Sequence, residues 1–328
     1  MEKAGADRDR ASSRAHRVVF FGTPGFAVPI LEALVSADHH VALVVSQPAR
    51  HAGRGRQLKD PPVAQMATQL GLPLFQPVRA RDPSAMLRVA SVAPDAVVLA
   101  AYGQILPAEL LSIPLKGSLN VHPSLLPRYR GASPISAPIL AGDTRTGVSI
   151  MLMDAGMDTG PILAQEETPI LDDDDQVSLT RQLAGTGARL LVHTLDAWLR
   201  GAIQPTPQEP SLASTTRRAT KEDGLLTWEE PAIDLWRRVR AYAEWPQAFT
   251  FWEGKQLRIL RATYLDEASA EPGRVIATNE RGRSAIGTRR GVLLPAIVGL
   301  EGKRPMPMDA FLRGAPRFIG SQLTATRG

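Results

Sequence analysis

Residues 17–199 alternate short runs of β-branched and other apolar residues with longer amphipathic stretches, and no other feature of the chain constrains its fold as much. The runs predict strands, and the stretches predict helices. Strands that alternate with helices pair in parallel, because each helix carries the chain back across the sheet. The sequence therefore predicts an α/β domain with a Rossmann-like, mostly parallel sheet and helices on both of its faces. We expect strands at 18–21, 41–46, 96–100, 118–121 and 148–153, and helices at 27–35, 61–70, 84–92, 135–141 and 176–199.

A proline-rich segment separates this part from the rest of the chain. Residues 204–214 contain Pro205, Pro207 and Pro210, which is typical of a linker. Beyond it, a predicted helix at 232–242 is followed by short apolar runs that glycines separate, a spacing typical of a small β-barrel. We therefore expect a first domain at 17–203, a linker at 204–214 and a smaller β-barrel domain at 215–328.

Composition excludes several classes of protein. The chain has no cysteine, so a disulfide framework, a thiolate metal site and a cysteine nucleophile are all excluded. No apolar stretch approaches the roughly 18 residues that cross a membrane. Residues 1–16 are polar and mixed in charge, without the apolar core of a secretory signal, so we expect a disordered tail there. These features favour a cytoplasmic protein with no membrane partner.

Two further segments partly resemble ligand-binding motifs, but neither fits its motif in full. The segment 22–25 (Gly-Thr-Pro-Gly) follows the first predicted strand, but it lacks the G-x-G-x-x-G spacing of a dinucleotide loop. The acidic run 172–175 suits a helix start better than a calcium loop, and the histidines lack metal-ligand spacing. We therefore expect neither a nicotinamide cofactor nor a metal ion.

Positive charge is concentrated in the C-terminal third of the chain. Residues 213–328 hold 19 Lys and Arg against 13 Asp and Glu, a net charge of +6, whereas the whole chain carries +5. Residues 50–59 form a second basic segment, rich in arginine and without an acid. A polyanionic partner would explain both features, and an ordinary solvated basic surface is the alternative.

A polar pair follows the predicted strand at 118–121. Asn120 and His122 are two residues apart, so their side chains project from the same face of an extended segment. An amide and an imidazole placed side by side can both donate hydrogen bonds to an oxyanion. Asp158, from a later segment between Gly156 and Gly160, can hold the imidazole protonated if the fold brings it there. The three residues predict acyl transfer without a covalent intermediate, and a packed structural histidine is the alternative.

The same residues carry a resemblance that covers nearly the whole chain from Arg17 onward. Seven ordered segments match, and an ordered set is far more specific than any one motif. The chain resembles the folate-dependent formyltransferases through the segments 21–24, 47–48, 52–56, 101–107, 120–127, 157–160 and 221–228.

The resemblance implies a fold, a reaction and a set of site residues. It implies an OB-like barrel for the second domain. It also implies that formyl passes from 10-formyltetrahydrofolate to the α-amine of methionine on charged initiator tRNA, with no metal and no DNA partner. Asn120, His122 and Asp158 would be catalytic. The folate would contact Gln104, Ile105, Leu106, Ser124, Leu125, Leu126 and Pro127.

The resemblance also implies where tRNA binds. The basic loop with Arg54 and Arg56 would reach the acceptor stem, since an arginine can hold a phosphate with two parallel donors. Arg218 and Lys221, just past the linker, would lie near the acceptor strand. Trp228 in the next apolar run is better explained as a core residue than as a stacking platform.

Three other functions remain open from the sequence. A sugar-amine N-formyltransferase would use the same three catalytic residues, although it would not need the basic segments. A formyl-folate hydrolase would use water as acceptor and would not need a tRNA-binding barrel. A non-catalytic RNA-binding protein on the same scaffold would be expected to have lost at least one of Asn120, His122 and Asp158, and all three are present.

Overall fold

The computed structural model describes residues 16–52, 57–278 and 283–327. The expected tail at residues 1–15, together with Arg54 and Arg56, lies outside the described residues. The chain forms two compact units, each made of several segments. The first contains 1–127, 147–166 and 183–213, and the second contains 128–146, 167–182 and 214–328. The domain boundaries expected from the sequence stay a prediction.

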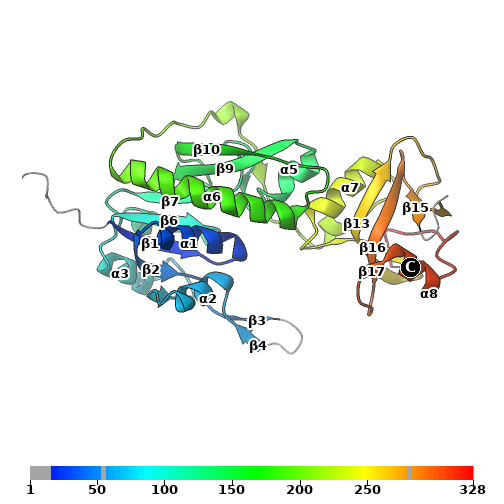
Figure 1. Cartoon of the computed structure of the whole chain (residues 1–328), viewed down its shortest axis with the longest axis horizontal. Coiled ribbons are helices and arrows are strands. Elements are labelled where there is room, and N and C mark those ends of the chain that lie inside the picture. Colours follow the sequence, from blue (N-terminus) through cyan, green and yellow to red (C-terminus); the bar gives the residue numbers. More distant parts are fainter. Residues whose placement is uncertain (1–15, 53–56, 279–282, 328) are drawn as a thin grey trace, which may run out of the picture. The chain divides into compact units, whose positions relative to one another are not determined.

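A seven-stranded sheet organises the N-terminal part, as expected (Figure 1). Its strand order is β10-β9-β7-β6-β1-β2-β5. The five strands from β7 to β5 pair in parallel, and β9 runs antiparallel to β7. The strands are β1 (Arg17–Gly22), β2 (His40–Val45), β5 (Leu74–Phe75), β6 (Ala96–Ala100), β7 (Ser118–His122), β9 (Arg145–Leu152) and β10 (Ile162–Pro169).

Helices cover both faces of this sheet, which confirms the expectation. On one face, Gly187 of α6 (Gln176–Leu199) lies against Val121 of β7 and near Ile30 of α1 (Val28–Ser36). On the other face, an apolar cluster joins β1, β2 and β6 to α3 (Pro83–Ser91) and α4 (Ala108–Leu111). In that cluster the rings of Phe21 and Tyr102 meet edge to face, 5.2 Å apart. Two helices, α2 (Pro62–Gln69) and α3, begin with proline, whose missing N–H costs nothing in the first turn.

The basic segment at 50–59 was expected to be a loop. That prediction was wrong for its described ends, which form strands. Strands β3 (Arg50–Ala52) and β4 (Gln57–Lys59) pair as an antiparallel ribbon, with Arg50 opposite Lys59. The residues of these strands have little intrinsic strand preference. Backbone pairing in a two-stranded ribbon does not require it, so the sequence pattern gave no signal.

The second unit contains an antiparallel sheet of the half-barrel type, with the order β12-β13-β16-β15-β14 and β17 beside β16. Its apolar core includes Trp252, Phe311 and Phe318, whose rings pack edge to face. Trp228 is buried in the same core, as expected. The elements are β12 (Ala248–Trp252), β13 (Lys255–Leu265), β14 (Val275–Ala277), β15 (Ser284–Gly287), β16 (Val292–Leu300), β17 (Met306–Pro307), α7 (Ala232–Ala241) and α8 (Met308–Gly314).

Other elements of this unit come from earlier in the chain. Strand β8 (Arg130–Gly131) pairs in parallel with β11 (Thr215–Thr216), and α5 (Ser136–Ala141) packs on α7. Within the described residues, no helix is long and apolar enough to span a membrane.

Two glycines of α6 give opposite expectations for stability. A Cβ added at Gly187 would lie 2.9 Å from Val121 Cγ1, whereas at Gly185 the nearest atom is an Arg189 nitrogen at 4.0 Å. We expect Gly185→Ala to stabilise the fold by about 0.5–1 kcal/mol, because alanine loses less backbone entropy on folding. Gly187→Ala should cost about 1–3 kcal/mol through overpacking. Urea titrations measure both changes, and equal stability of the two variants would contradict the close approach of α6 to β7.

Candidate active site

Strand β7 presents the polar pair that the sequence singled out. Ser118, Asn120 and His122 alternate with Leu119 and Val121, so the three polar side chains share one face of the sheet. Val121 faces α6 on the opposite side. In the ladder, Asn120 lies opposite Leu99 of β6, and both Asn120 and His122 are buried. A buried amide and imidazole on one face suit a site from which most water is excluded.

The Asp158 carboxylate reaches both members of the pair. Asn120 Nδ2 donates a hydrogen bond to Asp158 Oδ1 over 3.3 Å. His122 Nδ1 lies 3.7 Å from the other oxygen, Asp158 Oδ2. One carboxylate therefore spans the amide and the imidazole, with one oxygen toward each. The fold thus brings together all three residues expected to be catalytic.

The His122 ring and the Asp158 carboxylate are both largely shielded from solvent. The His122 side chain is 5% exposed and that of Asp158 16%, so water screens their charges weakly. A carboxylate beside an imidazole nitrogen fixes the orientation of the ring. An imidazole N–H can donate a hydrogen bond to developing negative charge. The second amide hydrogen of Asn120 can do the same.

The Asp158 loop is held in a tightly specified conformation. Asp158 itself has φ of 55°, in the left-handed region. Asp154 Oδ1 accepts hydrogen bonds from the Gly156 N–H at 3.0 Å and from the Thr159 hydroxyl at 2.7 Å. At Gly160 a Cβ would lie 1.8 Å from the carbonyl oxygen of Leu152, so only glycine fits there. The two glycines that flank Asp158 in the sequence therefore have steric and turn-forming roles.

The backbone of the segment 124–127 exchanges hydrogen bonds with side chains of β9 and β10 that no sequence pattern identified. Ser149, opposite His122 on β9, donates to the Ser124 carbonyl at 2.6 Å and accepts from the Leu126 N–H at 3.0 Å. Gln165 on β10 donates to the Leu126 carbonyl at 2.8 Å. Neither Ser149 nor Gln165 belongs to a recognisable local motif, so only the strand pairing identifies them. Ser124 and Leu126 are buried, whereas Leu125 and Pro127 are partly exposed.

The three residues 104–106 have different surroundings. The Gln104 side chain accepts from the Ala80 N–H at 2.9 Å and donates to the Val78 carbonyl at 3.0 Å, so it connects its loop to the segment 78–80. Leu106 is buried in the apolar cluster, and Ile105 is 84% exposed. Ile105 is therefore the side chain of this segment that a ligand in solution meets first, while backbone groups remain the candidates for polar recognition.

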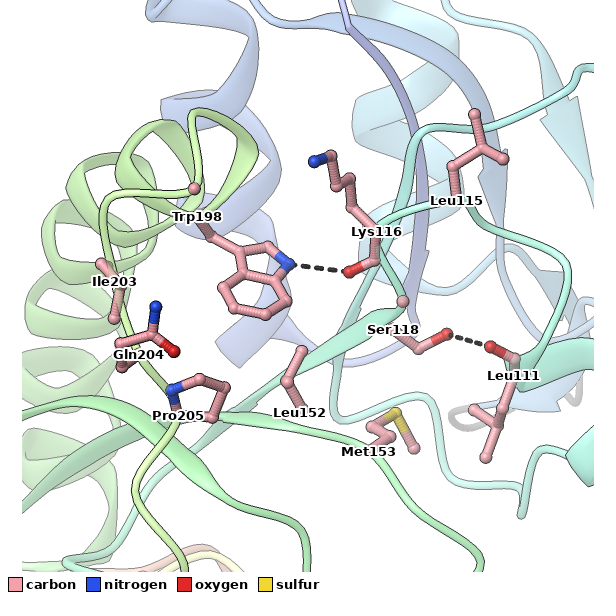
Figure 2. A pocket seen from close by; sticks show the side chains of 12 residues that line it. Leu111, Leu115, Lys116, Ser118, Leu152, Met153, Trp198, Ile203, Gln204 and Pro205 are labelled. Carbon is pink, nitrogen blue, oxygen red and sulfur yellow. Dashed lines mark hydrogen bonds between the residues drawn. The ribbon is translucent and has the colours of Figure 1, made fainter.

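A cavity of about 520 Å³ lies at the start of β7 and the end of β9 (Figure 2). Ser118 of β7 and Met153, just after β9, contribute to its wall, together with Leu111 from the other side of the loop before β7. Trp198, near the end of α6, donates its indole N–H to the Lys116 carbonyl at 2.7 Å and closes another side. The lining includes Ser118 at the start of β7 but none of Asn120, His122 and Asp158, so this cavity is separate from the polar pair.

The residues expected to bind tRNA are only partly described. Arg218 and Lys221 are exposed in the second unit. The adjacent Arg217 pairs with Asp223, whose pKa falls to about 2 chiefly because that guanidinium donates to its carboxylate. In the described part of the chain, no group of three or more His, Asp or Glu side chains is arranged to hold a metal ion.

Solved structures with the same fold have low sequence identity to this chain. HypX from Aquifex aeolicus, in complex with tetrahydrofolic acid, matches with a TM-score of 0.65 and 18% identity, over 93% of this chain and 48% of that one. WlaRD, a sugar 3N-formyl transferase, matches with a TM-score of 0.63 and 17% identity, over 88% of this chain and 99% of that one.

Curated relatives are much closer in sequence. A protein of Roseiflexus sp. (strain RS-1) named methionyl-tRNA formyltransferase is 46% identical over 310 residues, which cover 94% of this chain and 95% of that protein. A protein of the same name from Geobacter sulfurreducens is 40% identical, over 94% of this chain and 96% of that protein. The family descriptions "Formyl transferase" and "Formyl transferase, C-terminal domain" match residues 16–195 and 218–316. Matches of this extent and identity mean that the chain belongs to the formyl transferase family.

Proposed function

We propose that this protein is a methionyl-tRNA formyltransferase, which transfers the formyl group of 10-formyltetrahydrofolate to the α-amino group of methionine on initiator tRNA for translation initiation. The observation that carries the proposal is the Asp158 carboxylate placed against both Asn120 and His122. It occurs in a chain that is 46% and 40% identical to two relatives of that name, over 94% of its length. On this proposal the enzyme acts in the cytoplasm, where charged initiator tRNA is used.

Asn120 and His122 stabilise the charge that develops during transfer. When bound, 10-formyltetrahydrofolate supplies the formyl carbon that the methionyl amine attacks. Asn120 Nδ2 and the imidazolium of His122 donate hydrogen bonds to the formyl oxygen as it becomes an oxyanion. Asp158 keeps His122 charged and correctly oriented. The proton that the amine loses passes through Asp158 and water to the donor nitrogen, as the bond between that nitrogen and the formyl carbon breaks and tetrahydrofolate leaves. No protein nucleophile is needed, which agrees with the lack of cysteine in the chain.

The folate donor would bind at the carboxyl end of the parallel strands, where open α/β sheets bind ligands. It would lie between the segments 104–106 and 124–127, beside Asp158. Residues 104–106 would flank the pterin ring, and backbone groups would bind its edges. A folate analogue bound in the half-barrel unit instead would refute this placement.

The basic residues of the second unit and the ribbon β3–β4 would bind tRNA. The net charge of +6 over residues 213–328 suits a polyanion, and Arg218 and Lys221 are exposed. A sugar-amine N-formyltransferase is the second candidate in the same family. It is favoured only by structural neighbours of 17–20% identity, whose likeness concerns the fold.

An acceptor panel tests the proposed reaction. Labelled 10-formyltetrahydrofolate is offered with charged initiator tRNA, charged elongator tRNA, a nucleotide amino-sugar or water alone. We expect rapid transfer to the initiator tRNA, much slower transfer to the elongator tRNA and background elsewhere. Preferred labelling of the amino-sugar would establish the second candidate, and rapid release of formate would indicate a hydrolase.

A charge reversal at Lys221 tests the tRNA surface. Lys221→Glu should raise the KM for charged tRNA, and the effect should be larger at low salt, where phosphate attraction is least screened. The slope of log binding constant against log salt concentration should also become shallower by about 0.9 or somewhat less, because one phosphate contact is removed. Glu253→Lys, at another exposed position of the same unit, changes the net charge by two in the opposite direction and shows how much of an effect comes from net charge alone. If Lys221→Glu leaves both the KM and the salt dependence unchanged, Lys221 is not part of the tRNA-binding surface.

A further inference from the structure

The proline-rich segment after α6 contacts the loop that carries Asp158. Gln208 Nε2 donates to the backbone carbonyl of Asp158 at 2.8 Å and to that of Gly160 at 2.7 Å. A single amide group therefore holds two carbonyls that bracket the residue after Asp158. The sequence predicted a linker at 204–214, with no role at the site.

Gln208 is itself fixed by backbone pairing two residues earlier. Thr206 and Ile162, the first residue of β10, exchange two hydrogen bonds of 2.8 Å, which form an isolated antiparallel bridge. Pro205 and Pro207 lack an N–H, so Thr206 supplies the donor between them. A residue before proline also prefers an extended backbone, which suits pairing. The prolines thus set the register that brings Gln208 to the Asp158 loop.

The loop needs such a hold because its conformation is unfavourable by itself. Asp158 has a positive φ, which costs a non-glycine residue about 1 kcal/mol or more, and surrounding contacts must maintain it. The side chain of Asp154 closes the first half of the loop through Gly156 and Thr159. Gln208 fixes the second half of the loop through its hydrogen bonds to the Asp158 and Gly160 carbonyls. Without it, the carboxylate would be less well placed against Asn120 and His122.

We infer that Gln208 is a positioning residue for catalysis, which fixes the Asp158 loop so that one carboxylate contacts both oxyanion donors. The expected effect on kcat rests on the proposed function. The expected effect on the Asp158 loop rests only on the two hydrogen bonds. It makes the segment 206–208 part of the catalytic unit. Gln208 touches neither donor nor acceptor in this account, so it acts only through Asp158.

The inference predicts a loss of turnover without a loss of binding. Gln208→Ala should lower kcat about 10- to 100-fold, the range expected when a catalytic group is misplaced by about 1 Å. The KM values for folate and charged tRNA should change less than threefold. Gln208→Glu should lower kcat further, because a carboxylate cannot donate to two carbonyls and repels them. Glu209→Gln is the matched control, since the exposed Glu209 carboxylate bonds to Ser211, and this variant should keep wild-type kcat.

A double-mutant comparison separates positioning from general destabilisation. If Gln208 acts through Asp158, then adding Gln208→Ala to Asp158→Ala should cause no further loss of kcat, whereas independent effects would multiply. Amide exchange should also accelerate at residues 156–162 in Gln208→Ala and stay unchanged in α6.

The outcomes of these measurements are distinguishable. Wild-type kcat in Gln208→Ala, or multiplicative losses in the double variant, would overturn the inference and leave the proposed function intact. If the wild-type protein fails to formylate charged tRNA while exchange at 156–162 still rises in Gln208→Ala, the proposed function fails and the hold on the loop stands. Unchanged exchange at 156–162 would overturn the hold itself.

Discussion

His122→Ala is expected to lower kcat for formyl transfer by about 10³- to 10⁴-fold. The substitution removes an oxyanion donor, which is worth about 10²- to 10³-fold, and a group that takes part in proton transfer, which is worth about 10²- to 10⁴-fold. Quenched assays with labelled donor and charged tRNA measure the loss, and circular dichroism checks the fold. The three side chains act as a unit, so removing Asp158 as well should add little.

A second histidine provides the control for this prediction. His193 is exposed on α6, and His193→Ala should leave kcat unchanged. His122→Gln should have an intermediate effect, because it keeps an N–H donor but not the charge. A folded His122→Ala protein with kcat within tenfold of wild type would exclude His122 from the chemistry.

Gly160→Ala should also abolish most activity, although residue 160 has no functional group. Its Cβ would lie 1.8 Å from the Leu152 carbonyl oxygen and 2.9 Å from the carbonyl carbon, both of them backbone atoms that cannot rotate away. The loop must therefore move, and Asp158 is only two residues distant. We expect kcat to fall about 100-fold, as for a catalytic group displaced by about 1 Å, and the unfolding free energy to fall by about 1–3 kcal/mol.

Gly156→Ala is the matched variant in the same loop. There the obstructing atom is the Thr159 hydroxyl, at the end of a side chain that can adopt another rotamer. We expect a smaller loss of kcat than for Gly160→Ala. Equal losses in the two variants would mean that any added methyl group disturbs the loop, and that the contact with Leu152 has no special importance.

Local sequence patterns predicted five of the seven strands of the first sheet and missed β5 and β10. The strand at 96–100 and the helix at 176–199 occur at the expected residues, because long apolar periodicity and β-branched runs are local signals. The spacing of Asn120 and His122 placed them on one face for the same reason. The predicted loop at 50–59 was wrong at its ends, since ribbon pairing there depends on backbone groups that every residue has.

Contacts between distant segments could not be predicted from local pattern. The approach of Asp158 to Asn120 spans 38 residues and depends on a left-handed residue and two glycines in a tight loop. The contacts of Ser149 and Gln208 are hydrogen bonds to backbone carbonyls, which any donor of suitable length could make. Family resemblance singled out Asn120, His122 and Asp158 as candidates, whereas only the structure shows the contacts that hold them.

The central claim is that the methionyl amine attacks the formyl carbon directly within the Asn120–His122–Asp158 site. A rapid-quench experiment with labelled 10-formyltetrahydrofolate and excess enzyme tests it most directly. We predict that label passes from donor to charged initiator tRNA in a single phase, with tetrahydrofolate formed at the same rate and no label on the protein. Label that accumulates on the protein before it reaches the tRNA, or transfer that survives in Asn120→Ala/His122→Ala, would contradict the account.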